Sequence, residues 1–173
     1  VAEIPGLQRL LFFTDAAVIP YPTTEQFHAQ LGYIADTYRS VTGNDCPRVA
    51  LTHCTEKVSE KFPLTLSYEE LKKEAREGAF GSIEVDGPMD VKTACDAESG
   101  AIKGIASPVV GNADILIFPD IEAGNTFYKA ITLFAKATVA GMLAGTTAPV
   151  VVTSRADTVE SKFYSLATAC MKA

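Results

Sequence analysis

The sequence predicts an α/β protein, arranged as a three-layer α/β/α sandwich around a mainly parallel sheet. Short apolar runs bounded by turn residues, such as Ile115–Phe118 and Val150–Val152, are typical of buried parallel strands. Helical patterns separate these runs, and strands that alternate with helices favour parallel pairing with right-handed crossovers. No repeat or linker interrupts the 173 residues, so we expect a single α/β domain over residues 1–173.

The first of five strand-helix units predicted by the sequence begins with the apolar strand Leu10–Phe13. A helix follows from about Thr24, with Thr23 and Gln26 at the spacing of a capping box. Gly43 stands where this helix should end, because glycine adopts the left-handed conformation that commonly ends a helix.

The second and third units follow the same pattern. The strand Arg48–Thr52 precedes a helix that we expect to open at Ser67 and to close at Gly78. The short strand Ser82–Val85 precedes a helix over Val91–Ala97.

The last two units flank the longest helical pattern in the chain. After a loop over Ser99–Pro108, the strand Ile115–Phe118 leads into this helix, and the strand Val150–Val152 leads into a final helix from Asp157. The long helix is expected from four apolar residues at helical spacing, namely Phe127, Ile131, Phe134 and Met142.

Composition and charge exclude several classes of partner. A formal net charge of −6 argues against binding to nucleic acid or to an anionic membrane surface. No apolar run approaches the ~20 residues that span a bilayer, and the first residues lack the pattern of a secretory signal. The four cysteines lack metal-ligand spacing, so we expect no metal site, reduced thiols and a cytoplasmic location.

Polar motifs follow each predicted strand. If the sheet is parallel, these motifs meet at one edge, where ligands bind in open α/β sheets. They are Thr14-Asp15, His53-Cys54, Asp86-Gly87-Pro88, the segment 119–125 and the segment 153–157.

The segment TSRAD (153–157) holds the strongest candidates for chemistry. Ser154 and Arg155 would stand beside a helix N-terminus, where backbone N–H groups and a guanidinium suit a phosphate or another oxyanion. Asp157 is open to two interpretations. It either caps the last helix together with Glu160, which we favour, or belongs to the catalytic set.

The other motifs are weaker candidates. In DIEAGN, Asp120 is expected to cap a helix. Glu122 and Asn125 could reach the ligand cleft expected at this edge of the sheet, and Gly124 permits close approach of a ligand or a packing partner. Asp86-Gly87-Pro88 most often forms only a turn. We expect no catalytic pair of His53 and Cys54, because adjacent strand residues point to opposite faces.

Three motifs together resemble the phosphate acetyl/butyryltransferase family, and the resemblance extends over essentially the whole chain. The motifs are DGP (86–88), GNADILIFPDIEAGNTFYK (111–129) and APVVVTSRAD (148–157). EKVSEKFP (56–63) and SYEELKKEAREG (67–78) are similar to the phosphate butyryltransferase branch.

The resemblance implies acyl transfer between coenzyme A and phosphate. Acyl-CoA, phosphate and acyl phosphate would be the partners, coenzyme A would be a substrate, and no cofactor would be tightly bound. Ser154, Arg155 and Asp157 would form the catalytic set. A downstream aspartate that relatives are proposed to use as the base falls on Ser161, which leaves the base in doubt.

The substrate-binding residues would come from two of the family motifs. They are Asp86, Gly87, Pro88, Glu122, Gly124 and Asn125.

The resemblance also implies an architecture. The fold would be similar to the isocitrate/isopropylmalate dehydrogenase-like fold, and the protein would form a homo-oligomer. The chain matches about the C-terminal half of a family member, so we expect it to be part of a larger two-domain acyltransferase that lacks further arginines for the phosphates of coenzyme A.

Two other functions stay open from the sequence. One is a non-catalytic module of the same fold that binds a phosphate or coenzyme A or mediates an interaction. The other is a metal-dependent decarboxylating dehydrogenase, for which the scattered Asp86, Asp120 and Asp157 give weak support.

Overall fold

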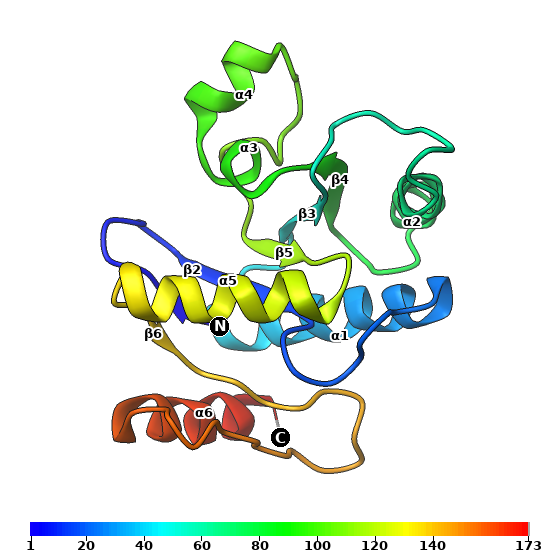
Figure 1. Ribbon diagram of the computed structural model, residues 1–173. Coiled ribbons are helices and arrows are strands. Elements are labelled where there is room, and N and C mark those ends of the chain that lie inside the picture. Colours follow the sequence, from blue (N-terminus) through cyan, green and yellow to red (C-terminus); the bar gives the residue numbers. More distant parts are fainter. Residues whose placement is uncertain (173) are drawn as a thin grey trace.

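The chain builds a six-stranded mixed sheet with helices on both faces (Figure 1). The computed structural model describes residues 1–172. The strands are β1 (Ala2–Glu3), β2 (Leu10–Thr14), β3 (Arg48–Thr52), β4 (Glu84–Met89), β5 (Ile115–Ile117) and β6 (Thr138–Val139).

The order of the strands is β4-β3-β5-β2-β1-β6. The first four are parallel, whereas β1 pairs antiparallel with both β2 and β6. The α/β class was therefore predicted correctly, but the expectation of a mainly parallel sheet was wrong. A short connection through Gly6, which has a positive φ of 89°, joins β1 to β2, and a connection that short permits only antiparallel pairing.

Helices follow most of the strands, as the sequence predicted. The helix α1 has the expected capping box between Thr23 and Gln26, and Gly43 ends it in the left-handed conformation. The helices are α1 (Thr24–Thr42), α2 (Leu64–Arg76), α3 (Val91–Cys95), α4 (Ala97–Lys103), α5 (Ile121–Phe134) and α6 (Val159–Lys172).

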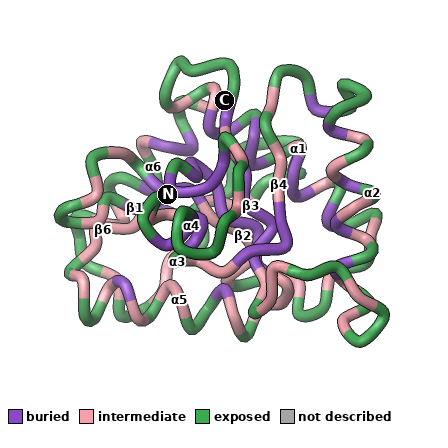
Figure 2. The backbone as a smooth tube through the Cα atoms, turned by 90° about the horizontal axis from the view of Figure 1, so that it is seen from above, coloured by how far each residue is buried: buried purple, intermediate pink, exposed green. Residues whose placement is uncertain are grey.

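The core lies on both faces of the sheet, in two clusters of buried residues. Many of the buried residues gather near the centre of the molecule, drawn purple in Figure 2. Neighbouring strand residues face opposite layers, so Phe12 packs with α1 and α2 while Leu11 packs with α3 and residues of α5. The helix α6 lies outside these layers and contacts α1 and β6.

The expected strand Val150–Val152 is not part of the sheet. Val150 forms only an isolated bridge to Leu143, and the side chain of Val152 is 64% exposed. A short apolar run has the same sequence signature whether it is buried in a sheet or lies on the surface, which explains this wrong prediction.

The long helix is shorter than its apolar spacing suggested. α5 ends at Phe134, and Lys136 adopts a positive φ of 55° that leads the chain away from the helix. The β-branched residues of β6 then pair with β1, so Met142 lies beyond both elements.

The helix α2 begins at Leu64, one turn before the predicted start at Ser67. Pro63 occupies the N-cap position with a helical φ of −54°, so no side-chain cap is present. The Ser67 hydroxyl instead accepts a hydrogen bond from Thr24 on α1 (3.4 Å). Gly78 follows the helix end with a φ of 88°, as expected.

The strand β4 extends beyond the predicted Ser82–Val85 and includes the Asp86-Gly87-Pro88 motif. At Gly87 the strand passes so close to β3 that a Cβ atom would lie 2.5 Å from the Leu51 carbonyl oxygen. Only glycine permits this approach, so the motif continues the strand instead of turning away from it.

The predicted helix Val91–Ala97 is divided in two. Asp96 ends α3 and caps α4 by accepting the N–H groups of Glu98 and Ser99. The helix α4 therefore covers part of the segment Ser99–Pro108 that the sequence predicted as a loop.

Candidate functional site

The carboxyl end of β2 and the start of α5 are joined by a network of hydrogen bonds. The Asp15 carboxylate accepts the N–H groups of Ala17, Val18 and Ile19 at 2.8–3.0 Å, which fixes the loop after β2. On α5, Asp120 caps the helix as predicted and accepts the Ala123 N–H at 2.7 Å. The Ile121 N–H at the start of α5 donates to the Pro20 carbonyl oxygen (3.0 Å), so the two loops meet at one sheet edge.

Glu122, Gly124 and Asn125 hold this loop in place. The Asn125 amide donates to the Ala16 carbonyl oxygen (2.9 Å), and Glu122 accepts from the Tyr21 hydroxyl (2.5 Å). A Cβ atom at Gly124 would lie 2.0 Å from the Asp15 carbonyl oxygen. The close approach expected at Gly124 is thus made to a packing partner.

His53 and Cys54 follow β3 at the same edge. The Cys54 Sγ atom lies 3.6 Å from His53 Nδ1, so the prediction that strand geometry keeps them apart was wrong. Because β3 ends at Thr52, these two residues do not alternate as strand neighbours do. Burial lowers the pKa of His53, whose ring packs edge-on against Phe62.

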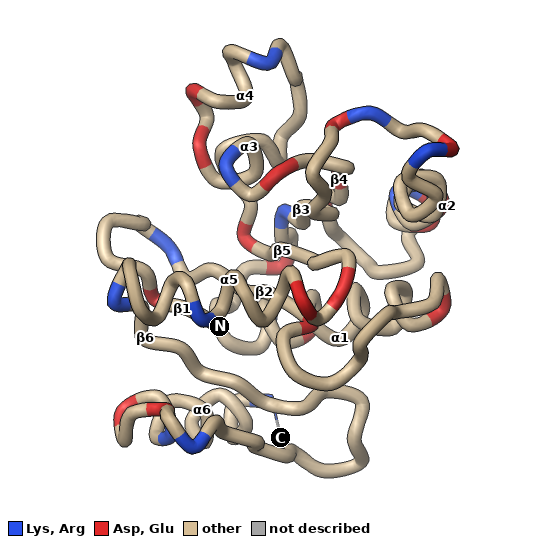
Figure 3. Tube along the Cα trace, in the orientation of Figure 1, with Lys and Arg blue, Asp and Glu red and all other residues tan. Residues whose placement is uncertain are grey.

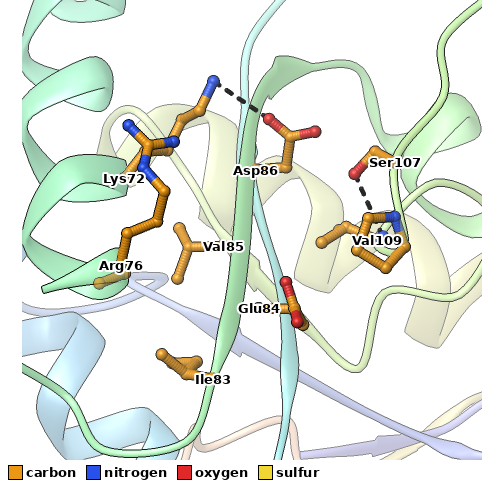
Figure 4. A pocket seen from close by; sticks show the side chains of 10 residues that line it. Lys72, Arg76, Ile83, Glu84, Val85, Asp86, Ser107 and Val109 are labelled. Atoms are coloured by element: carbon orange, nitrogen blue, oxygen red, sulfur yellow. Dashed lines mark hydrogen bonds and ion pairs between the residues drawn. The ribbon is translucent and has the colours of Figure 1, made fainter. Parts of the chain in front are cut away.

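Asp86 lies on the edge strand β4, where Lys72 of α2 reaches it (Figure 4). Lys72 also donates to Glu69 and to the Gly87 carbonyl oxygen, so all three of its protons have acceptors. Burial alone would raise the pKa of Asp86, but the Ser107 hydroxyl, the Gly87 N–H and Lys72 together hold it below its usual range.

Two small hollows, both lined by Asp86 of β4 and Lys72 of α2, flank Asp86. One, of about 260 Å³, is lined in part by Arg76 and Ser107, and the other, of about 160 Å³, by Gly87 and Pro88. Asp86-Gly87-Pro88 therefore lines a surface at the β4 edge of the sheet, with β3 and β5 between it and β2.

The TSRAD segment is a turn that precedes α6, and no sheet strand leads into it. Asp157 Oδ2 accepts the Ser154 N–H at 2.7 Å, and the Tyr128 hydroxyl of α5 donates to Oδ1 of the same carboxylate. Asp157 does not cap the last helix, because Thr158 accepts the Ser161 N–H at 3.1 Å in the manner of an N-cap residue.

Arg155 is exposed at this turn and forms no ion pair within residues 1–172. Lys129 lies nearby on α5, with its Nζ atom 4.0 Å from the centre of the Tyr128 ring. Ser154, half-buried, presents its hydroxyl to the Ala156 N–H at 3.4 Å. A free guanidinium beside a hydroxyl can receive an oxyanion.

Of the five polar motifs, three follow parallel strands as predicted: Thr14-Asp15, His53-Cys54 and the segment 119–125. Asp86-Gly87-Pro88 lies inside its strand. TSRAD is linked to these motifs by the hydrogen bond between Asp157 and Tyr128 of α5. The contact of Tyr128 with Asp157 bridges 29 residues of sequence, and no local pattern could have indicated it.

Within residues 1–172, no three His, Cys, Asp or Glu side chains are grouped so that they could hold a metal ion. None of the described helices has the length and apolar character needed to cross a membrane.

The sequence matches the family described as "Phosphate acetyl/butaryl transferase" over residues 1–170. It is 42% identical to a phosphate acetyltransferase of Thermotoga maritima over 96% of this chain and 56% of that protein. It is 39% identical to a phosphate butyryltransferase of Clostridium beijerinckii over 100% of this chain and 57% of that protein.

The fold is similar to that of a branched-chain phosphotransacylase from Enterococcus faecalis V583, with a TM-score of 0.87 and 33% identity. That match covers 99% of this chain and 62% of the other. The chain thus spans little more than half the length of the curated relatives named above.

Proposed function

Because the chain belongs to the phosphate acetyl/butyryl transferase family, we propose that it takes part in moving a short-chain acyl group between coenzyme A and inorganic phosphate. In this reaction a phosphate oxygen attacks the thioester carbonyl, the C–S bond breaks, and acyl phosphate and coenzyme A leave. The substrates are acyl-CoA and phosphate in one direction, and acyl phosphate and coenzyme A in the other.

One observation carries this proposal, namely the exposed guanidinium of Arg155 beside Ser154 in a turn held by Asp157. The attack develops negative charge on the carbonyl oxygen while the phosphate is already anionic. Arg155 and the Ser154 hydroxyl would bind and stabilise these oxygens, which lowers the barrier without a covalent protein intermediate.

The remaining candidates have supporting roles in the proposal. Asp157 is the carboxylate next to Arg155, and it is our candidate for activating the coenzyme A thiol. Glu122, Gly124 and Asn125 shape the sheet edge, and Asp86, Gly87 and Pro88 would contribute the wall of the substrate cleft from β4.

The chain is, in this proposal, one α/β domain of a larger two-domain enzyme. Support comes from α6, whose inward residues are small while its large apolar side chains face outward. Ser165 and Ala169 are buried, whereas Phe163 is 64% exposed and Val159 is 84% exposed. A face of this kind normally packs against another protein surface.

The fold family, the location and the assembly of the protein belong to the same proposal. The four parallel strands with helices on both faces are consistent with an isocitrate/isopropylmalate dehydrogenase-like fold, although the added β1 and β6 make the sheet mixed. We also place the protein in the cytoplasm as a homo-oligomer, because its cysteines are free and α6 has an apolar outer face.

The proposal is tested by Arg155→Ala in an active full-length polypeptide that contains this chain. Loss of a hydrogen bond to a charged group is worth about 1.5–3 kcal/mol, so acyl transfer should fall roughly ten- to a hundredfold. Thermal stability should not change, because Arg155 is exposed and has no ion pair in the described part of the chain.

The matched control is Lys73→Ala, which removes an exposed cation from α2. It should leave acyl transfer unchanged. Near-normal kinetics in Arg155→Ala would contradict the proposal that Arg155 binds the reacting oxygens.

A further inference from the structure

The turn that carries Arg155 has little support of its own. No sheet strand leads into it, and two hydrogen bonds between Ser154 and Asp157 close it. The Ser154 N–H donates to Asp157 Oδ2 (2.7 Å), and the Asp157 N–H donates to the Ser154 carbonyl oxygen (3.1 Å). Figure 3 shows the long, sparsely charged segment before α6 running outside the main layers. The turn therefore needs a contact to a rigid element if Arg155 is to keep one position.

Tyr128 supplies that contact. It lies on α5, half-buried, and its hydroxyl donates to Oδ1 of Asp157 while Oδ2 accepts the Ser154 N–H. A single carboxylate thus joins a helix packed on the sheet to the turn beside Arg155. The first residues of α5 are themselves fixed against the loop after β2, by the close packing of Gly124 and the hydrogen bond of Asn125.

The chemistry of Tyr128 suits this contact. Burial and the bond to Asp157 raise the pKa of the hydroxyl well above its usual range, so it stays protonated and remains a donor at neutral pH. Lys129 lies over the ring, 4.0 Å from its centre, and keeps a second cation near the turn.

We infer that Tyr128 is a positioning residue, whose hydroxyl acts through Asp157 to hold the Ser154–Arg155 turn against α5 in the geometry that receives an anion. This inference rests on the proposed function for the identity of the anion. The contact by which Tyr128 holds the turn can be tested without any anion. Tyr128 does not need to touch the substrate.

The first test is limited digestion of the 173-residue chain with trypsin, which cuts after arginine and lysine. Tyr128→Phe removes only the hydroxyl, and cleavage after Arg155 should become about tenfold faster, the change expected when a hydrogen bond to a charged group no longer closes the turn. Cleavage after Lys61, an exposed loop residue, should stay unchanged in the same digestion.

Tyr164→Phe is the matched control, because Tyr164 lies on α6 and is 43% exposed. It should leave cleavage after Arg155 at the parent rate. Equal rates in Tyr128→Phe and the parent would overturn the inference. The inference would also be overturned if the rate of cleavage after Lys61 rose as much as the rate after Arg155, because equal rises would indicate general destabilisation.

The second test is titration with inorganic phosphate. Tyr128→Phe should weaken phosphate binding about fivefold to tenfold in the parent chain and should have no further effect in Arg155→Ala. If the two substitutions weakened phosphate binding additively in the double variant, Tyr128 would not act through Arg155 and its positioning role would be overturned. If the parent binds no phosphate, the proposed anion site fails, and the digestion still decides whether Tyr128 holds the turn.

Discussion

Individual residues in this chain are explained by contacts that bridge long distances in sequence. Gly124 is required by the carbonyl of Asp15, and Asp157 is held by Tyr128. The sequence indicated that Gly124 permits close approach and that Asp157 belongs to a polar turn, but it could not identify either partner. Such partners depend on how the loops fold over the sheet edge.

Gly124→Ala tests the packing role of this glycine. Its Cβ would lie 2.0 Å from the Asp15 carbonyl oxygen, so the loop after β2 must shift, and the free energy of unfolding should fall by about 1–3 kcal/mol or more. Denaturant unfolding measures the change.

Gly32→Ala is the control within α1, since its Cβ would meet only Phe80 at an ordinary 3.9 Å. That change should be neutral or stabilising, because alanine favours helix. Unaltered stability of Gly124→Ala would show that the loop adapts easily.

Asp90 links stability to pH. Burial alone would raise its pKa, but hydrogen bonds from Lys103 and the Thr93 N–H lower it from 3.8 to about 2. A lowered folded-state pKa stabilises the protein above the unfolded value, and the contribution is lost as the pH falls through the folded value.

Asp90→Asn should therefore unfold at a lower temperature than the parent at pH 7, and the difference should shrink between about pH 4 and pH 2. Glu60→Gln, which alters an exposed carboxylate, is the control and should show no comparable trend. A difference in melting temperature that stays constant down to pH 2 would contradict the role of ionised Asp90.

Elements with their own local signals were predicted well. The capping box at Thr23 and the glycine at the end of α1 are sufficient to define that helix. The run Val150–Val152 lacked any such signal, and its apolar side chains suggested a strand where the structure has a surface segment. Sequence patterns report that a segment is apolar, but they do not report what covers it.

The outer face of α6 gives a prediction at this scale. Phe163→Ser combined with Leu166→Ser should weaken self-association of the chain without lowering its thermal stability, because both side chains are mostly exposed. Sedimentation velocity over a range of concentrations measures the association.

Ile102→Ser on α4 is the control, since Ile102 is equally apolar and 79% exposed but lies on a different helix. It should leave the association unchanged. A parent chain that is monomeric at high concentration would contradict the prediction for α6.

At the scale of the whole molecule, a folded core and an incomplete site are compatible. The two buried clusters on either face of the sheet support folding, and Lys129, which lies over the Tyr128 ring, adds one cation near the Arg155 turn. Coenzyme A and a substrate phosphate together carry several negative charges, which normally require several cationic contacts. The family match over only part of the relatives' length agrees with this division.

The most direct test of this account is the rate of phosphate-dependent coenzyme A release from butyryl-CoA and acetyl-CoA by the purified 173-residue chain. A full-length relative assayed under the same conditions supplies the reference rate. We predict that the chain is folded, as judged by a cooperative thermal transition, but shows little or no turnover. Turnover comparable to that of the full-length enzyme would contradict the claim that this chain holds only part of the acyltransferase site.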